Sequence, residues 1–286
     1  MKITVDAPAK INLFLDIVGK LDNGYHSLFM VMQSVDLCDT VTVENAESGI
    51  ALTCSDERLP CNEKNIAYKA ADAFFKKANI EPAVKIHIEK RIPFAAGLAG
   101  GSADGAAVLA ALNRLYDNAL TEEELLKTGL SVGSDIPFCI LGGTRLALNT
   151  GGVLAPLAPL KECFIVLSKP DRGVSTAQAY ADADSTHIYH PDCMKMLDAC
   201  ENGDFENICR YAGNVFEQVV EVPERVEIKE IMRSSGASLC QMSGSGPTVF
   251  GLFGSKTDAE ACLEKVRKIC PDSFLAMPCR HGAEII

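Results

Sequence analysis

The chain has 286 residues, 48% of them hydrophobic and 23% charged, which is the composition of an ordinary soluble globular protein. This length is enough for about two domains with sizeable cores, so neither disulfides nor a structural metal are needed for stability. Lys and Arg total 27 against 38 Asp and Glu, a net charge of −11. We therefore expect no nucleic-acid partner, since sequence-independent binding of nucleic acid depends on clustered cations.

The N-terminal segment and the cysteines exclude further classes. Asp6, Lys10 and Asn12 stand where a signal peptide would be apolar, and no apolar run approaches the 18 or so residues of a membrane helix. We expect a cytoplasmic protein with no membrane partner. None of the 12 cysteines forms a C-x-x-C pair, and most have apolar neighbours. They are interpreted as small buried hydrophobic residues rather than ligands or nucleophiles.

The pattern of elements predicts an α+β protein. In chain order, strands are predicted at 3–5, 11–18, 30–35 and 40–43 with a turn at 22–24, a helix at 64–78, a strand at 84–88, helices at 102–116 and 121–130, a strand at 163–168, helices at 175–182, 192–201 and 223–235, strands at 238–242 and 247–253, a helix at 257–269 and a strand at 274–279. Thr121 and Glu124 form a predicted capping box. Runs of consecutive strands favour antiparallel sheets over a doubly wound parallel sheet. The Gly- and Pro-rich segment 151–161 divides the chain into predicted domains 1–155 and 156–286.

The most informative segment is IPFAAGLAGGS, Ile92 to Ser102, between a predicted strand and a predicted helix. Its glycines allow close backbone approach to a ligand, and the following helix start offers unpaired N–H groups, so the segment predicts a phosphate site. Neither the dinucleotide pattern nor the P-loop fits, because Ser102 stands where both require glycine. The alternative is a helix-entry turn packed with small residues.

The pattern PxxxGLxxGSA at residues 93–103, followed by an apolar helix, resembles the nucleotide loop of the superfamily of galactokinase, homoserine kinase, mevalonate kinase and phosphomevalonate kinase, the GHMP kinases. Segments 8–37, 133–144 and 242–253 are similar to the branch that phosphorylates a diphosphocytidyl polyol for isoprenoid precursors. The resemblance implies a two-domain α+β fold, with an N-terminal half like ribosomal protein S5 and a ferredoxin-like C-terminal half. It also implies ATP and Mg²⁺ as cofactors, a small-molecule cytidine diphosphate derivative as substrate, and a monomer or homodimer.

The resemblance also assigns the nucleotide contacts. They are Pro93, Phe94, Ala95, Ala96, Gly97, Leu98, Ala99, Gly100, Gly101, Ser102, Ala103, Asp104 and Asn65. Asn65 has an alternative role as a helix cap. Ser102 is the predicted metal contact. Ala95, Ala96 and Ala99 stand where relatives carry more glycine, which predicts a loop of different stiffness with binding retained.

Two charges lie in otherwise apolar or small-residue runs: Lys10 in APAKINLFL and Asp135 in VGSDIPFCIL. A charge among apolar neighbours needs a partner, so we expect these two to meet, either as a structural ion pair or as catalytic groups. They match the catalytic positions of the resembled family. That match implies Asp135 as the base for the attacking hydroxyl, and Lys10 as the cation that keeps Asp135 ionised and neutralises the transferring phosphoryl group.

For the substrate, the resemblance implies contacts from Asn12, Tyr25, His26 and Tyr180, with the cytosine between the two tyrosines. The alternatives are a surface turn tyrosine and a core-facing helical aromatic. The run at 243–247 is either a tight hairpin or a turn over the active site. Lys20, Lys90 and Arg91 are predicted to rim the cleft. Competing functions are another alcohol kinase, acting on mevalonate or homoserine, and a non-catalytic nucleotide-binding regulator.

Overall fold

The computed structural model describes residues 1–22 and 24–286, so the predicted turn at 22–24 includes one residue, Asn23, outside the described residues. In this part of the chain the larger sheet has eight strands in the order β12-β1-β2-β4-β3, with β5 on β2, β6 on β5 and β8 on β1. Their bounds are β1 (Lys2–Lys20), β2 (His26–Asn45), β3 (Gly49–Cys54), β4 (Ala83–Glu89), β5 (Thr144–Asn149), β6 (Val153–Pro156), β8 (Gly213–Asn214) and β12 (Glu284–Ile285).

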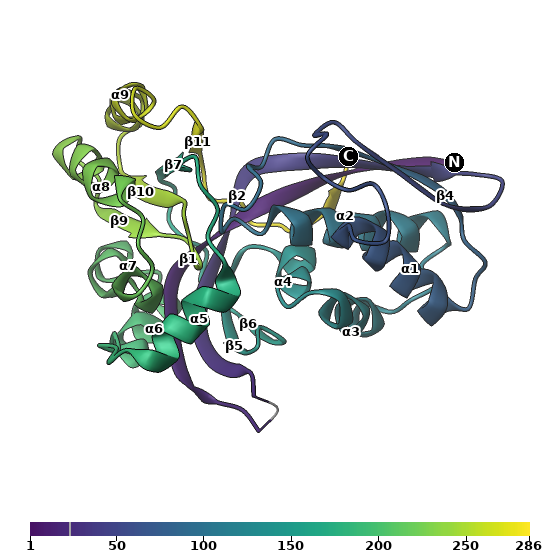
Figure 1. The fold of residues 1–286 in the computed structure, drawn as a ribbon, viewed down its shortest axis with the longest axis horizontal. Coiled ribbons are helices and arrows are strands. Elements are labelled where there is room, and N and C mark those ends of the chain that lie inside the picture. The colour runs from purple at the N-terminus through teal and green to yellow at the C-terminus, as the bar shows by residue number, and fades with distance from the viewer. Residues whose placement is uncertain (23) are drawn as a thin grey trace.

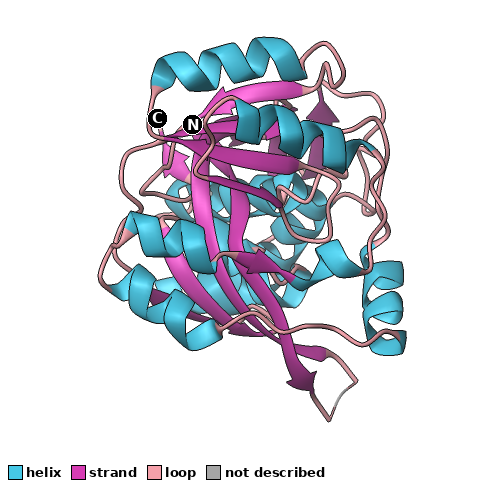
Figure 2. Cartoon of the chain, turned by 90° about the vertical axis from the view of Figure 1, so that its left-hand side faces the viewer, coloured by secondary structure: helices cyan, strands magenta, loops and turns pink. Residues whose placement is uncertain are grey.

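The two longest strands, β1 and β2, pair along most of their length and form the centre of the larger sheet. Each is one long strand where the sequence pattern predicted two short ones, because β1 is buried on both faces from Pro8 to Asp16 and so loses its alternation. Register shifts after Pro8, Asn12 and Ile17 bend the pair. Figure 1 shows it running from the N-terminus to the hairpin at the opposite end, and Figure 2 shows helices packed along it.

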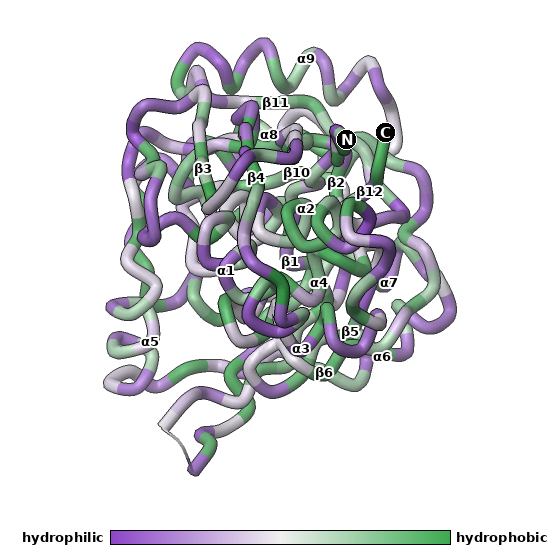
Figure 3. The backbone as a smooth tube through the Cα atoms, turned by 90° about the vertical axis from the view of Figure 1, so that its right-hand side faces the viewer, coloured by the Kyte–Doolittle hydropathy of each residue, from purple (hydrophilic) through white to green (hydrophobic). Residues whose placement is uncertain are grey.

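Three helices contact the larger sheet: α1 (Ile66–Ala78), α2 (Gly100–Leu115) and α4 (Ile136–Leu141). A fourth, α3 (Glu122–Val132), packs on these helices. In α2, 11 of the 16 residues are buried, and its Ala and Gly side chains permit close packing. In Figure 3 much of α2 has the green colour of hydrophobic residues. The predicted capping box at Thr121 and Glu124 is confirmed. The six-residue helix α4 was not predicted, because it is too short to show a period.

A second sheet has the order β11-β7-β10-β9, all antiparallel. It consists of β7 (Phe164–Ser168), β9 (Leu239–Met242), β10 (Val249–Phe253) and β11 (Ser273–Ala276). The remaining helices are α5 (Thr176–Ser185), α6 (Cys193–Glu201), α7 (Phe205–Tyr211), the 3₁₀ turn η1 (Val215–Gln218), α8 (Glu224–Ser234) and α9 (Lys256–Val266). The α+β prediction is confirmed, and both sheets are antiparallel apart from two parallel pairs in the larger one, β3–β4 and β1–β8. Strands β3, β5 and β6 and helix α7 were not predicted.

The end of the chain returns to the larger sheet. Strand β12 pairs with β1, and Pro278 bridges Val35, so the two termini lie at the same end of the molecule (Figure 1). Strand β8 also joins β1, in parallel. Segments beyond residue 155 therefore contribute to both sheets, and the division at 155/156 stays a prediction.

The cysteines are free thiols throughout the described ranges, and six are buried: Cys139, Cys163, Cys200, Cys262, Cys270 and Cys279. Burial raises the pKa of the Cys163 thiol to about 12, so this group stays protonated and inert. Cys61 is exposed, which corrects the prediction for that residue, because its loop precedes α1 on the surface. No helix within the described ranges has the length and apolar character to cross a bilayer.

Candidate active site

A cavity of about 1000 Å³ lies where the predicted phosphate loop meets β1, the β1–β2 hairpin and α5. Every predicted substrate and catalytic residue lines it: Lys10, Asn12, Tyr25, His26, Asp135 and Tyr180. Most of the predicted nucleotide contacts also line this cavity: Asn65, Pro93, Phe94, Ala95, Ala96, Gly97, Ala99, Gly100, Gly101, Ser102 and Asp104. Leu98 and Ala103 are each 1% exposed and pack into the core, so their backbones alone can serve a ligand.

The phosphate loop ends in a helix with uncapped N–H groups. Helix α2 begins at Gly100, two residues before the predicted start, and its N-cap residue, Ala99, makes no side-chain cap. The first N–H groups of α2 are therefore available to an anion. Ala95 and Ala99 have φ of 51° and 57°, a left-handed backbone that glycine adopts at lower cost. Alanine in these two positions thus makes the loop strained and conformationally restricted.

Gly97 fixes the loop to the 243–247 turn. Its φ is +73°, its carbonyl accepts a 2.9 Å hydrogen bond from Ser243 Oγ, and a Cβ there would overlap the Ser243 and Gly246 carbonyl oxygens. The turn closes as a hairpin through Ser243 and Thr248, and it also borders the cavity through Gly244 and Ser245. Both sequence interpretations of this turn therefore hold.

Lys10 and Asp135 meet as predicted. Lys10 is 5% exposed, and its Nζ lies 3.8 Å from Asp135 Oδ2 while donating a 2.7 Å hydrogen bond to Asn12 Oδ1. Asp135 is the N-cap residue of α4, yet its side chain makes no cap hydrogen bond, and the side chain is 30% exposed. At 3.8 Å the attraction is electrostatic, so the carboxylate oxygens remain available to accept a proton or hydrogen bond from a hydroxyl.

Lys90 lines the cavity, as the prediction of a cation at the cleft requires, but it is buried and ion-paired rather than exposed at the rim. Its side chain is 7% exposed and forms ion pairs with Asp39 and, at 2.7 Å, with Asp104. Asp39 Oδ1 also accepts hydrogen bonds from the backbone N–H groups of Arg91 and Ile92, at 2.6 and 2.8 Å. This buried triad of Lys90, Asp39 and Asp104 therefore joins the entrance of the phosphate loop to α2. Burial, together with the neighbouring Asp39, raises the pKa of Asp104 to about 8, although Lys90 opposes the shift.

The far end of the cavity is aromatic. The His26 ring stacks on Tyr180 with centroids 4.5 Å apart and 13° between planes, and Tyr180 meets the edge of Phe216 at 5.0 Å. Burial raises the pKa of Tyr180 to about 12, so its hydroxyl stays neutral. Tyr25 is 66% exposed beside it. The ring found on Tyr180 is that of His26, and the cytosine sandwich stays a prediction.

Asn65 is the N-cap residue of α1, which confirms the alternative prediction of a helix cap. Its Oδ1 accepts from Ala67 N at 2.9 Å, and its Nδ2 donates to Pro60 O at 2.8 Å. Several further cavity residues had no sequence signal: Lys64, Ser134, Thr150, Thr176 and Phe216. The 2.9 Å contact between Thr176 Oγ1 and Ser245 Oγ, which joins α5 to the 243–247 turn, links residues 69 positions apart.

The residues present fit a Mg²⁺ ion held chiefly by phosphate oxygens. Within the described ranges no group of three His, Cys, Asp or Glu side chains could hold a metal ion. Ser102, in the first turn of α2, and Asp135 both line the cavity, whereas Asp104 is engaged by Lys90. Mg²⁺ commonly keeps several waters and binds through substrate phosphates with one or two protein ligands. This small donor set is consistent with that mode.

Comparisons with known proteins identify the class. Residues 65–143 match the family "GHMP kinases N terminal domain" and residues 196–272 match "GHMP kinases C terminal". A homoserine kinase from Cytophaga hutchinsonii shares the fold, with a TM-score of 0.77 at 20% identity over 100% of this chain and 97% of that one. The fold is thus the two-domain α+β fold of the GHMP kinases, and the chain is a kinase that uses ATP on a small molecule.

More similar relatives place the chain in one family within the GHMP kinases. The chain is 44% identical to 4-diphosphocytidyl-2-C-methyl-D-erythritol kinase of Exiguobacterium sibiricum, over 96% of this chain and 97% of that protein. It is 45% identical to the kinase of the same name from Bacillus mycoides, over 96% of each. A crystal structure of a 4-(cytidine 5′-diphospho)-2C-methyl-D-erythritol kinase aligns with a TM-score of 0.81 at 31% identity, covering 97% and 99% of the two chains. The chain belongs to the family of 4-diphosphocytidyl-2-C-methyl-D-erythritol kinases.

Proposed function

We propose that the protein transfers the γ-phosphoryl group of ATP to the 2-hydroxyl of 4-diphosphocytidyl-2-C-methyl-D-erythritol, in the non-mevalonate route to isoprenoid precursors. The observation that carries this proposal is the single cavity that joins the phosphate loop, the Lys10–Asp135 pair and an aromatic end. The names of relatives that are 44% and 45% identical support the choice of substrate.

The loop and the start of α2 bind the phosphates of ATP. Phosphoryl transfer needs positioning and charge stabilisation more than covalent chemistry, and the uncapped N–H groups beside Gly100 and Gly101 supply both without a cationic surface. The net charge of −11 is then no obstacle, because the attraction for ATP is local. Mg²⁺, held by phosphate oxygens and Ser102, would supply further charge neutralisation when bound.

Asp135 orients the substrate hydroxyl and accepts its proton as the bond to phosphorus forms. Lys10 is the electrostatic partner of Asp135 and faces the charge that develops on the transferred group. Asn12 holds Lys10 in place through the 2.7 Å hydrogen bond to its Nζ. The substrate's cytosine lies at the aromatic end with Tyr25, His26 and Tyr180. We also propose a cytoplasmic monomer or homodimer, with its domains divided at 155/156.

The test is release of ADP from ATP and Mg²⁺ by the purified chain with each of three acceptors: the diphosphocytidyl substrate, mevalonate and homoserine. We expect turnover with the first alone, and competitive inhibition by CDP. Turnover with mevalonate or homoserine instead would assign a different alcohol kinase. Folded protein that binds ATP but phosphorylates none of the three would support a regulator.

A further inference from the structure

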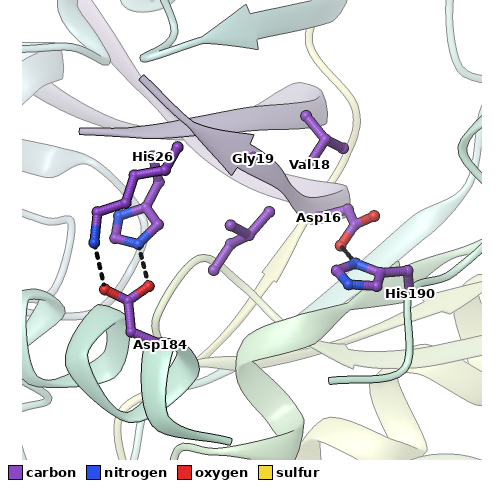
Figure 4. Close-up of a pocket in the computed structure, with 8 residues that line it drawn as sticks. Asp16, Val18, Gly19, His26, Asp184 and His190 are labelled. Carbon is purple, nitrogen blue, oxygen red and sulfur yellow. Dashed lines mark hydrogen bonds and ion pairs between the residues drawn. The ribbon is translucent and has the colours of Figure 1, made fainter. Parts of the chain in front are cut away.

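A second, smaller cavity of about 460 Å³ adjoins the aromatic end of the active site. It is lined by residues 16–20 of β1 together with His26, Asp184 and His190 (Figure 4). His26 lines both cavities, whereas Asp184 lines the smaller cavity and not the larger one. His26 is therefore part of the wall between the two cavities, and Asp184 lies on the side of the smaller one.

Asp184 holds the hairpin and α5 together. Its Oδ1 lies 2.7 Å from His26 Nε2, and its Oδ2 accepts a 2.9 Å hydrogen bond from Lys20 Nζ. A dashed line in Figure 4 marks the contact between Asp184 and His26. Asp184 is one turn after Tyr180 on α5, so both side chains lie on the same face of the helix. Of the α5 side chains only Ala179 and Ala183 are fully buried, and Tyr180 packs on Phe216, so the contacts of Asp184 add to those that fix this end of the helix.

These contacts of Asp184 orient the His26 ring more than they stabilise the folded protein. The Asp184 side chain is 44% exposed and that of Lys20 is 58% exposed, and exposed ion pairs contribute little to folding. A neutral imidazole, however, has one donor nitrogen and one acceptor nitrogen, and the partner of one nitrogen decides the role of the other. Since a carboxylate can only accept, it places the proton on Nε2 and leaves Nδ1 with its lone pair.

We propose that Asp184 is a positioning residue for the nucleobase: it fixes the His26 ring and its tautomer so that Nδ1 accepts a hydrogen bond from a 4-amino group. Cytosine carries an amino donor at that position, and uracil carries a carbonyl acceptor. The lone pair lies in the plane of the imidazole and points away from Nε2, which faces Asp184. The inference rests on the proposed function, since it deepens the recognition of a cytidine diphosphate derivative.

The experiment compares binding of CDP and UDP to the full chain by calorimetry at pH 8, without ATP. Wild type should bind CDP more tightly than UDP, by about three- to tenfold, the worth of one neutral hydrogen bond. Asp184→Asn should reduce this ratio to near one, because the amide can offer N–H to Nε2 as readily as oxygen. Lys20→Met, which leaves the Asp184–His26 contact in place, should keep the ratio.

A matched control is Asp182→Asn, on the same helix, where the carboxylate bonds Gln178 at 2.8 Å and not His26. It should bind both nucleotides as wild type does. ¹⁵N spectra of His26 give a readout that a purely structural role would not move: the Nε2–H tautomer should dominate in wild type and decline in Asp184→Asn.

A ratio of CDP to UDP affinity that persists in Asp184→Asn, or a wild-type His26 with its proton on Nδ1, would overturn the proposal. So would equal affinity of wild type for the two nucleotides, or binding of neither. If wild type prefers CDP through the Nε2–H tautomer yet fails to phosphorylate the diphosphocytidyl substrate, the proposed function is wrong and the base recognition stands.

Discussion

Lys90→Met tests how the phosphate loop is held. The substitution keeps an unbranched side chain of similar bulk and removes the single ammonium that bonds two buried carboxylates, Asp39 at 0% and Asp104 at 2% exposure. Breaking a buried ion pair on one side costs about 3–5 kcal/mol, because the remaining charge is left without a partner. That is a large share of a typical unfolding free energy of about 5–15 kcal/mol.

The cost should depend on pH. The pKa of Asp104 is raised from 3.8 to about 8 in the folded protein, so the folded state retains a proton that the unfolded chain has lost. Its contribution to stability is complete below about pH 4 and declines as pH rises through 8. Lys90→Met should therefore destabilise more at pH 8 than at pH 5, and Asp104→Asn should remove this part of the pH slope.

The assay is urea unfolding followed by circular dichroism at pH 5 and pH 8, with Lys127→Met as a control. Lys127 pairs with Glu123 on the surface, where both side chains are largely exposed, so its loss should leave the unfolding free energy unchanged. If Lys90→Met unfolds at the same urea concentration as wild type at pH 8, the triad does not stabilise the protein as we argue.

Three further predictions concern single positions. Gly97→Ala should leave the fold intact but raise the KM for ATP by tenfold or more, because the new Cβ would displace the 243–247 turn; an unchanged KM would remove the steric argument. Asn65→Ala should destabilise the protein by about 1 kcal/mol through loss of the α1 cap, and Asn65→Ser should restore it; an equal rise in KM for ATP in both variants would instead indicate an adenine contact. Under brief treatment with a thiol reagent, mass spectrometry should find Cys61 modified before Cys139; the reverse order would contradict their exposure.

The sequence could predict the parts of the site whose signal is local. The phosphate loop was visible because glycines precede an apolar helix, and Lys10 and Asp135 were visible because a charge among apolar residues needs a partner. Their meeting at 3.8 Å confirms that reasoning, although the catalytic roles stay proposals.

The parts that the sequence could not predict depend on distant pairing. Lys90 resembles a surface cation until Asp39, 51 positions away, is brought against it across the sheet. The long strand β1 loses its alternation because both faces are buried, so its single continuous span was hidden. Strands β8 and β12 have two residues each and exist only because β1 presents an edge to them.

The most direct test of the central claim is transfer of labelled γ-phosphate from ATP to 4-diphosphocytidyl-2-C-methyl-D-erythritol by wild type and by Asp135→Asn, with nucleotide binding measured in parallel. We predict a product phosphorylated on the 2-hydroxyl with wild type, and a fall in kcat of at least about 100-fold in Asp135→Asn with ATP affinity retained. Near-normal turnover by Asp135→Asn would contradict the role of this carboxylate. Absence of transfer by folded, ATP-binding wild type would contradict the function itself.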